Sequence, residues 1–224
     1  ILTILAVIGT TITPWAIFYL QASIADKGVD MSKYGDTKID VSFGAAWGNV
    51  ISAFILIVTA ATLHQAGIFV ENAKDAALAL EPLAGKWAGL LFSVGLLGAS
   101  LLAVSVLPLS TTYAMSEAFG FERGLNRRFK EAPFFYGSFA FIIIISMLIV
   151  LIPGVPLFPI MILSQAMNAV LLPLILFLIL KIANDPVIMG KYKNSKLTNI
   201  LAYSLTVMIT LITAVLIVEP FLNG

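Results

Sequence analysis

Oxygen-bearing residues gather around one proline near the start of the sequence, in the run Gly9-Thr10-Thr11-Ile12-Thr13-Pro14-Trp15. Pro14 has no N–H and its ring collides with the carbonyl four residues earlier, so the carbonyl of Thr10 loses its helical partner. We therefore expect a helix that is interrupted at Gly9 and Pro14, because glycine and β-branched residues weaken the same turn. Such a break would present hard oxygen ligands suited to a cation: the Thr10 carbonyl and the hydroxyls of Thr10, Thr11 and Thr13.

The same run also fits a simple proline kink in which the threonine hydroxyls bond back to carbonyls of their own helix. Glycine and proline are common in membrane helices. The two interpretations differ in whether the threonine oxygens face a cation or their own backbone, and the sequence leaves both open.

The composition identifies the elements that must carry this run. Of the 224 residues, 60% are hydrophobic and 11% are charged, against roughly 25% charged residues in an ordinary soluble domain. The sequence has no cysteine and one histidine, which excludes disulfide frameworks, thiolate sites and multi-histidine metal sites within this chain. No catalytic constellation or phosphate-binding loop is visible, so we expect neither an enzyme nor a bound cofactor. The net charge of +1 does not indicate a nucleic-acid partner.

Continuous apolar runs of about 20 residues predict membrane-spanning helices. We therefore expect an all-α membrane protein in the lipid bilayer with six transmembrane helices, the first of them interrupted. The predicted spans are 1–25, 41–66, 87–118, 134–152, 157–181 and 198–219. The sequence opens within an apolar run and without an initiator methionine, so we expect the C-terminal part of a longer protein.

Basic residues predict the orientation of these spans. The connectors that alternate to one side carry eleven of the 13 basic residues: Lys27, Lys33, Lys38, Arg123, Arg127, Arg128, Lys130, Lys181, Lys191, Lys193 and Lys196. The opposite side carries only Lys74 and Lys86. We therefore expect a multi-pass plasma-membrane protein with the richer connectors in the cytoplasm and the C-terminus outside.

Several motifs resemble the NRAMP divalent-metal transporters. The run from Gly9 to Trp15 resembles the sixth helix of that family, whose pattern is Gly-Ala-Thr-Val-Met-Pro-His. The further landmarks are Gly95-Leu96-Leu97-Gly98-Ala99-Ser100 in the eighth helix, Arg127-Arg128 at the start of the ninth, and Ile188-Met189-Gly190-Lys191-Tyr192-Lys193-Asn194 after the tenth. The resemblance covers nearly the whole chain, as helices six to eleven.

This resemblance implies a LeuT-like (APC) transporter fold. Residues 1–181 would form the second inverted repeat of five helices, and residues 182–224 a connector and one accessory helix. The missing N-terminal half would supply an aspartate that faces Thr10 and Thr13. The implied activity is membrane transport of a divalent metal ion by alternating access.

Residue 13 departs from the family pattern in a way that changes the expected ion. The family binds metal through a backbone carbonyl, which falls on Thr10, and a methionine sulfur, which falls on Thr13 and is absent. Thioether sulfur favours transition metals, whereas Mg²⁺ prefers oxygen and retains water. We therefore expect Mg²⁺ uptake, as in the NRAMP-related magnesium transporter branch, which the segments 107–113 and 117–120 also resemble.

The positions implicated in proton movement also differ. The family's histidine after the proline falls on Trp15, and a second histidine falls on Leu20 or Gln21. Because none of these side chains titrates, we expect a uniporter that is not coupled to protons.

Two polar residues in the fifth span complete the candidate site. Gln165 and Asn168 lie three residues apart and share a helix face, so they line the ion cavity or act as hydrogen-bonding contacts between helices. Trp15 either packs or fills the space of the missing histidine beside the cavity.

Three other functions stay open. One is a broad divalent (Mn²⁺) or Al³⁺ transporter of the same family. Another is a LeuT-like organic-solute carrier, in which the broken helix binds a carboxylate. The third is a non-transporting membrane receptor.

Overall fold

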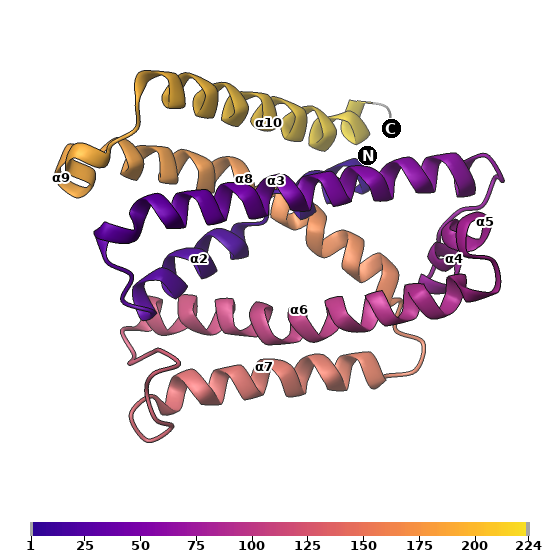
Figure 1. Cartoon of the computed structure of the whole chain (residues 1–224), viewed down its shortest axis with the longest axis horizontal. Coiled ribbons are helices and arrows are strands. Elements are labelled where there is room, and N and C mark those ends of the chain that lie inside the picture. Colours follow the sequence, from indigo (N-terminus) through magenta and orange to yellow (C-terminus); the bar gives the residue numbers. More distant parts are fainter. Residues whose placement is uncertain (1, 223–224) are drawn as a thin grey trace. The chain divides into compact units, whose positions relative to one another are not determined.

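The computed structural model describes the backbone of residues 2–222 and the side chains to residue 218. Every regular element in that range is helical (Figure 1). The long helices are α1 (Leu2–Thr11), α2 (Pro14–Asp26), α3 (Tyr34–Thr59), α6 (Ala88–Phe119), α7 (Pro133–Leu151), α8 (Leu157–Asn184) and α10 (Lys196–Leu222). The short ones are α4 (Ala73–Ala77), α5 (Glu81–Ala84) and α9 (Pro186–Met189), and a π-helical turn, Ala60–His64, follows α3.

Six helical stretches in this range are long and apolar enough to cross a membrane, which agrees with the prediction of an all-helical chain with six candidate spans. The second span differs from its predicted boundary, because α3 begins at Tyr34 and not near residue 41. The polar residues before residue 41 continue the helix because a helix makes its backbone hydrogen bonds internally, whether or not it is surrounded by lipid. Asp36 in the first turn is also favourable beside the positive end of the helix dipole.

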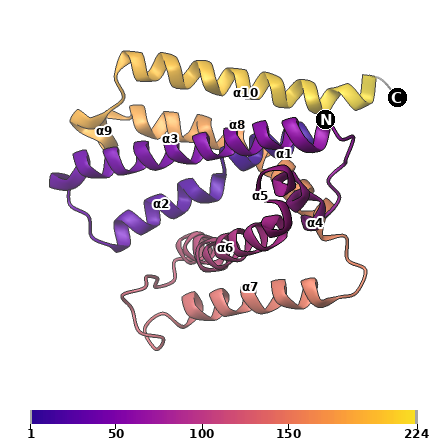
Figure 2. The ribbon, with the colours of Figure 1, turned by 45° about the vertical axis from the view of Figure 1, so that its right-hand side comes forward.

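The described chain consists of two compact units. The first comprises residues Ile1–Ile17 and Pro156–Gly224, and therefore holds α1, the start of α2, α8, α9 and α10. In this unit α1 packs along α8, and α10 packs on α8, as both views in Figures 1 and 2 show for α8 and α10. Its buried core consists of Leu5, Ala166, Ala169 and Leu216, with Ile8 against them. The two alanines allow close helix approach, a common feature of membrane helix packing.

The second unit comprises residues Phe18–Val155 and holds the rest of α2 together with α3 to α7. Helices α6 and α7 lie side by side in it (Figures 1 and 2). Its buried core is Ala22, Leu109, Tyr113, Ala132 and Phe135. The Tyr113 and Phe135 rings meet edge to face with centroids 4.9 Å apart, an arrangement that the ring quadrupoles favour.

Candidate functional site

The first span is interrupted between α1 and α2. Helix α1 ends at Thr11, α2 begins at Pro14, and Ile12 and Thr13 lie between them. Proline suits the first position of a helix, where its missing N–H is not needed and its fixed φ is already helical. The Ile12 amide still donates to the Ile8 carbonyl at 3.2 Å, and the Ala16 amide donates to the Thr13 carbonyl at 3.2 Å. Since Pro14 cannot donate, the Thr10 carbonyl lacks its usual i+4 partner.

The three threonines of the break differ in their hydrogen bonding. The Thr11 hydroxyl donates to the Val7 carbonyl of its own helix at 2.7 Å, which is the back-bonding of the simple-kink interpretation. Thr10 is exposed and Thr13 is half-buried, and among the described residues neither hydroxyl has a hydrogen-bond partner. Thr10 and Thr13 therefore offer oxygen to a ligand more readily than Thr11 does.

Gly9 places α1 directly against the backbone of α8. A Cβ at this position would lie 2.8 Å from the Ala169 amide nitrogen and still closer to the Gln165 carbonyl oxygen. Both neighbours are backbone atoms and cannot rotate away. The sequence predicts Gly9 as a helix-weakening residue, and the structure adds a steric reason for glycine: a close approach of the α1 and α8 backbones, one turn before Thr13.

Gln165 and Asn168 lie on α8 near this crossing. The Asn168 side-chain amide donates to the Gln165 side-chain carbonyl at 3.1 Å, and both residues are half-buried. This bond lies within one helix, so it is neither an interhelical contact nor an ion contact. Their roles as cavity-lining residues stay a prediction. Trp15 lies in the first turn of α2 and is half-buried.

A second polar cluster, which the sequence analysis did not identify, lies in the other unit at the end of α2. The Tyr113 hydroxyl donates to Asp26 Oδ2 at 2.8 Å, and the Leu125 amide donates to the same oxygen at 3.1 Å. The Asn126 side-chain amide donates to the Asp26 carbonyl at 3.2 Å. Gly124, at φ +123°, lies against the Asp26 carboxylate where a Cβ would clash. These bonds fasten the end of α2 to α6 and to the loop between α6 and α7.

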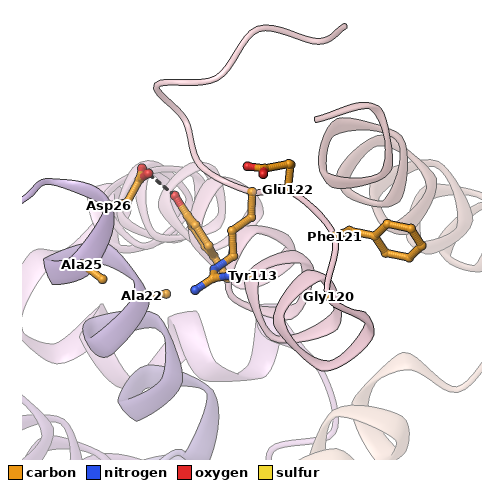
Figure 3. A pocket seen from close by; sticks show the side chains of 8 residues that line it. Ala22, Ala25, Asp26, Tyr113, Gly120, Phe121 and Glu122 are labelled. Carbon is orange, nitrogen blue, oxygen red and sulfur yellow. Dashed lines mark hydrogen bonds between the residues drawn. The ribbon is translucent and has the colours of Figure 1, made fainter. Parts of the chain in front are cut away.

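This cluster borders a cavity of about 360 Å³, and Figure 3 shows the Asp26 carboxylate and the Tyr113 hydroxyl meeting beside it. The lining residues are Ala22, Ala25, Asp26, Tyr113, Gly120, Phe121, Glu122 and Arg123. Arg123 forms an ion pair with Glu117 at 2.8 Å. No sequence signal marks the Asp26–Tyr113 contact, because its partners are 87 residues apart and follow no motif.

Carboxylates and histidines do not assemble into a metal site within the described part of this chain. No group of three or more such residues, or of cysteines, is close enough to hold a metal ion there. A cation at the break would therefore meet neutral oxygens from this chain. A dication held only by neutral oxygens is poorly compensated, so further charge would have to come from elsewhere.

A family model and individual relatives both place this chain among the same proteins. Residues 1–219 match the family described as natural resistance-associated macrophage protein-like (Nramp). The divalent metal cation transporter MntH of Erwinia tasmaniensis is 28% identical over 222 residues, covering 97% of this chain and 51% of the relative. MntH of Bacillus subtilis is 28% identical over 227 residues, with 96% and 49% covered. MntH of Clostridium acetobutylicum is 24% identical over 227 residues, with 99% and 50% covered. The chain thus spans about half the length of these relatives.

Proposed function

This chain belongs to the Nramp family, and we propose on that premise that it forms part of a membrane transporter for divalent metal cations. Three observations support the proposal: six helical stretches among the described residues that are long and apolar enough to cross a membrane, an interruption in the first of them, and relatives described as divalent metal cation transporters. Those relatives are transporters and not enzymes, which agrees with the expectation that the chain is not an enzyme. They give no support to an organic-solute carrier or a receptor.

The range of ions is best proposed as broad. The relatives share the description of divalent metal cation transporters, which favours the broad divalent alternative over transport of Mg²⁺ alone. Membership of the magnesium branch within the family rests only on the sequence resemblance.

We assign the ion contact of this chain to the break between α1 and α2. The Thr10 carbonyl, without its helical partner, and the Thr13 oxygen are the proposed ligands, with Thr11 in a lesser role because its hydroxyl bonds to Val7. Gly9 and Pro14 shape the break, and Trp15, Gln165 and Asn168 are proposed to line the cavity beside it.

The surrounding architecture is part of the same proposal. Residues 1–181 are proposed as the second repeat of a LeuT-like fold and 182–224 as a connector and accessory helix. An N-terminal half of the same protein would supply the carboxylate that a dication needs, and the basic connectors would face the cytoplasm.

A second candidate, preference for Mg²⁺, rests on the side chain at residue 13. Threonine there offers a hard oxygen and leaves room for water, whereas a thioether would favour softer metals. The stretch of residues 2–25 contains no Asp, Glu, His, Lys or Arg. Because a proton relay needs side chains that titrate within the membrane, the absence of these residue types from this stretch supports a second proposal, transport that is not coupled to protons. The membrane potential would supply about 4.6 kcal/mol per 100 mV to a dication, from about 2.3 per charge.

The test of these proposals is ion uptake by the full-length protein in proteoliposomes. Thr13→Met is expected to raise the ratio of Mn²⁺ or Cd²⁺ uptake to Mg²⁺ uptake by roughly tenfold, equal to about 1.4 kcal/mol. Thr3→Met, the same change at an exposed position of α1, serves as the control and should leave the ratio unchanged.

Three results would count against separate parts of the proposal. An unchanged ratio in Thr13→Met would remove Thr13 from the ion path. If the interior of the proteoliposomes acidifies only when the metal ion is taken up, proton movement is coupled to ion transport, and the uniport proposal is wrong. A protein that carries no divalent cation at all would overturn the proposed function.

A further inference from the structure

The connector between α8 and α10 carries positive charge that no side chain among the described residues neutralises. Residues 181–196 contain four exposed lysines: Lys181, Lys191, Lys193 and Lys196. The single acid among them, Asp185, caps α9 by accepting bonds from the Val187 amide at 2.7 Å and the Ile188 amide at 3.3 Å. None of the four ammonium groups forms an ion pair with any side chain among residues 2–218. Lys191 only lies over the ring of Tyr192, 5.2 Å from its centre.

The other strongly basic connector, between α6 and α7, shows a different arrangement. There Arg123 pairs with Glu117 at 2.8 Å and Arg127 pairs with Glu122 at 3.5 Å. Internal acids thus compensate part of its charge. Within the described residues the α8–α10 connector is left with a net excess of positive charge, which an external anion would balance.

Apolar side chains project from the same connector. Val187 is 92% exposed and Ile188 is 63% exposed at the start of α9. Both residues lie between the end of one span and the start of the next, since α8 ends at Asn184 and α10 begins at Lys196. Exposed aliphatic residues among lysines, at the point where spans leave the hydrocarbon, match the polar and apolar layers of a lipid headgroup region.

The connector is held in place by an asparagine network. The side-chain amides of Asn184 and Asn199 bond reciprocally, and the Asn194 side chain donates to Asn199 at 3.1 Å. The Asn194 backbone amide donates to the Ala183 carbonyl at 3.1 Å. These bonds join the end of α8 to the start of α10, so the backbone that carries the lysines has a defined conformation. Figure 1 shows α9 in the connector between these two helices.

From this juxtaposition we propose that residues 181–196 form a binding surface for anionic phospholipid headgroups in the leaflet where α8 ends. The four lysines contact the phosphate groups, and Val187 and Ile188 enter the layer beneath them. A soluble anion would balance the charge but would leave these two side chains in water, so the observations favour lipid. This surface is independent of which ion the protein carries.

The experiment uses the full-length protein in vesicles of phosphatidylcholine with phosphatidylglycerol. The 224 residues contain no cysteine, so Val187→Cys places one fluorophore on this chain once any cysteine elsewhere is replaced by serine. Quenching is compared between nitroxide-labelled phosphatidylglycerol and nitroxide-labelled phosphatidylcholine at equal mole fraction. Phosphatidylglycerol should be enriched at least about fivefold near the label, the effect of a single lysine at an anionic surface.

Two variants, a change of salt concentration and the addition of inorganic phosphate complete the test. Replacing all four lysines together (Lys181→Gln, Lys191→Gln, Lys193→Gln and Lys196→Gln) should abolish the preference, and Lys74→Gln with Lys86→Gln should preserve it. Raising the salt from 0.1 to 1 M should reduce the preference of the unmutated lysine set, because the screening length falls from about 10 to about 3 Å. The salt dependence tests the proposal even if the quadruple variant fails to fold.

Inorganic phosphate, added at constant ionic strength, should not reverse the preference. Equal quenching by the two lipids, a preference that survives removal of the lysines, or reversal by free phosphate would each overturn the proposal.

Discussion

Gly9→Ala offers a quantitative test of how α1 meets α8. The added methyl group would lie 2.8 Å from the Ala169 nitrogen and nearer still to the Gln165 oxygen. Since both are backbone atoms, the helices must separate, and overpacking of this kind costs about 1–3 kcal/mol. Replacing glycine by alanine inside a helix gains only about 0.5–1 kcal/mol. At the middle of both ranges the steric term is the larger by about 1 kcal/mol, so the free energy of unfolding should fall by about that amount.

The measurement is the thermal unfolding midpoint of the full-length protein in detergent, followed by uptake in proteoliposomes. Gly137→Ala in α7 is the matched control, because outside the adjoining backbone of α7 no atom of the described residues lies within 4 Å of the new methyl group. Gly9→Ala should lower the midpoint by a few degrees and reduce uptake, since it displaces the break, while the control should do neither. A Gly9→Ala protein as stable and active as the unmutated one would refute the close approach of the two helices.

Three further substitutions test individual contacts. Tyr113→Phe removes the 2.8 Å hydrogen bond to Asp26 and should lower the free energy of unfolding by about 1–2 kcal/mol, because hydrogen bonds to charged groups contribute about 1.5–3 kcal/mol and the Leu125 amide still donates to Asp26. Thermal unfolding measures the change. Tyr203→Phe, at an exposed position, is the control and should leave the stability unchanged. Asn199→Ala breaks the bonds to Asn184 and Asn194 and should cost about 1–2 kcal/mol. Asn49→Ala is the control: it loses only a hydrogen bond to Ala45 on the exposed face of its own helix and should change the thermal unfolding midpoint little. Equal effects of Asn199→Ala and Asn49→Ala would argue against the asparagine network. Thr11→Val removes a bond within α1 and should leave ion uptake within about twofold, whereas a much larger loss would place the Thr11 oxygen on the ion.

The elements could be predicted from sequence because lipid imposes a strong rule on composition. Runs of about 20 apolar residues mark the spans, and Pro14 marks the break, since a missing N–H acts locally whatever surrounds it. The early start of α3 at Tyr34 was not predicted. Helices extend into water without an apolar signal, and the apolar run alone defined the expected start.

The contacts between distant residues could not be predicted in the same way. Gly9 was expected only to weaken a helix, and its role against Gln165 depends on a partner 156 residues away. The Asp26–Tyr113 bond and the reciprocal Asn184–Asn199 pair likewise depend on packing that no local pattern encodes. The Gln165–Asn168 spacing predicted a shared face correctly, but the structure pairs the two with each other.

The position of a bound cation tests the central claim most directly. Crystals of the full-length protein soaked in Mn²⁺ would give an anomalous density peak. The peak should lie within the coordination distance of an oxygen-bound divalent cation, about 2.0–2.6 Å, from the Thr10 carbonyl. A peak remote from the α1–α2 break, with the Thr10 and Thr13 oxygens packed against protein or lipid, would contradict the assignment of the ion site.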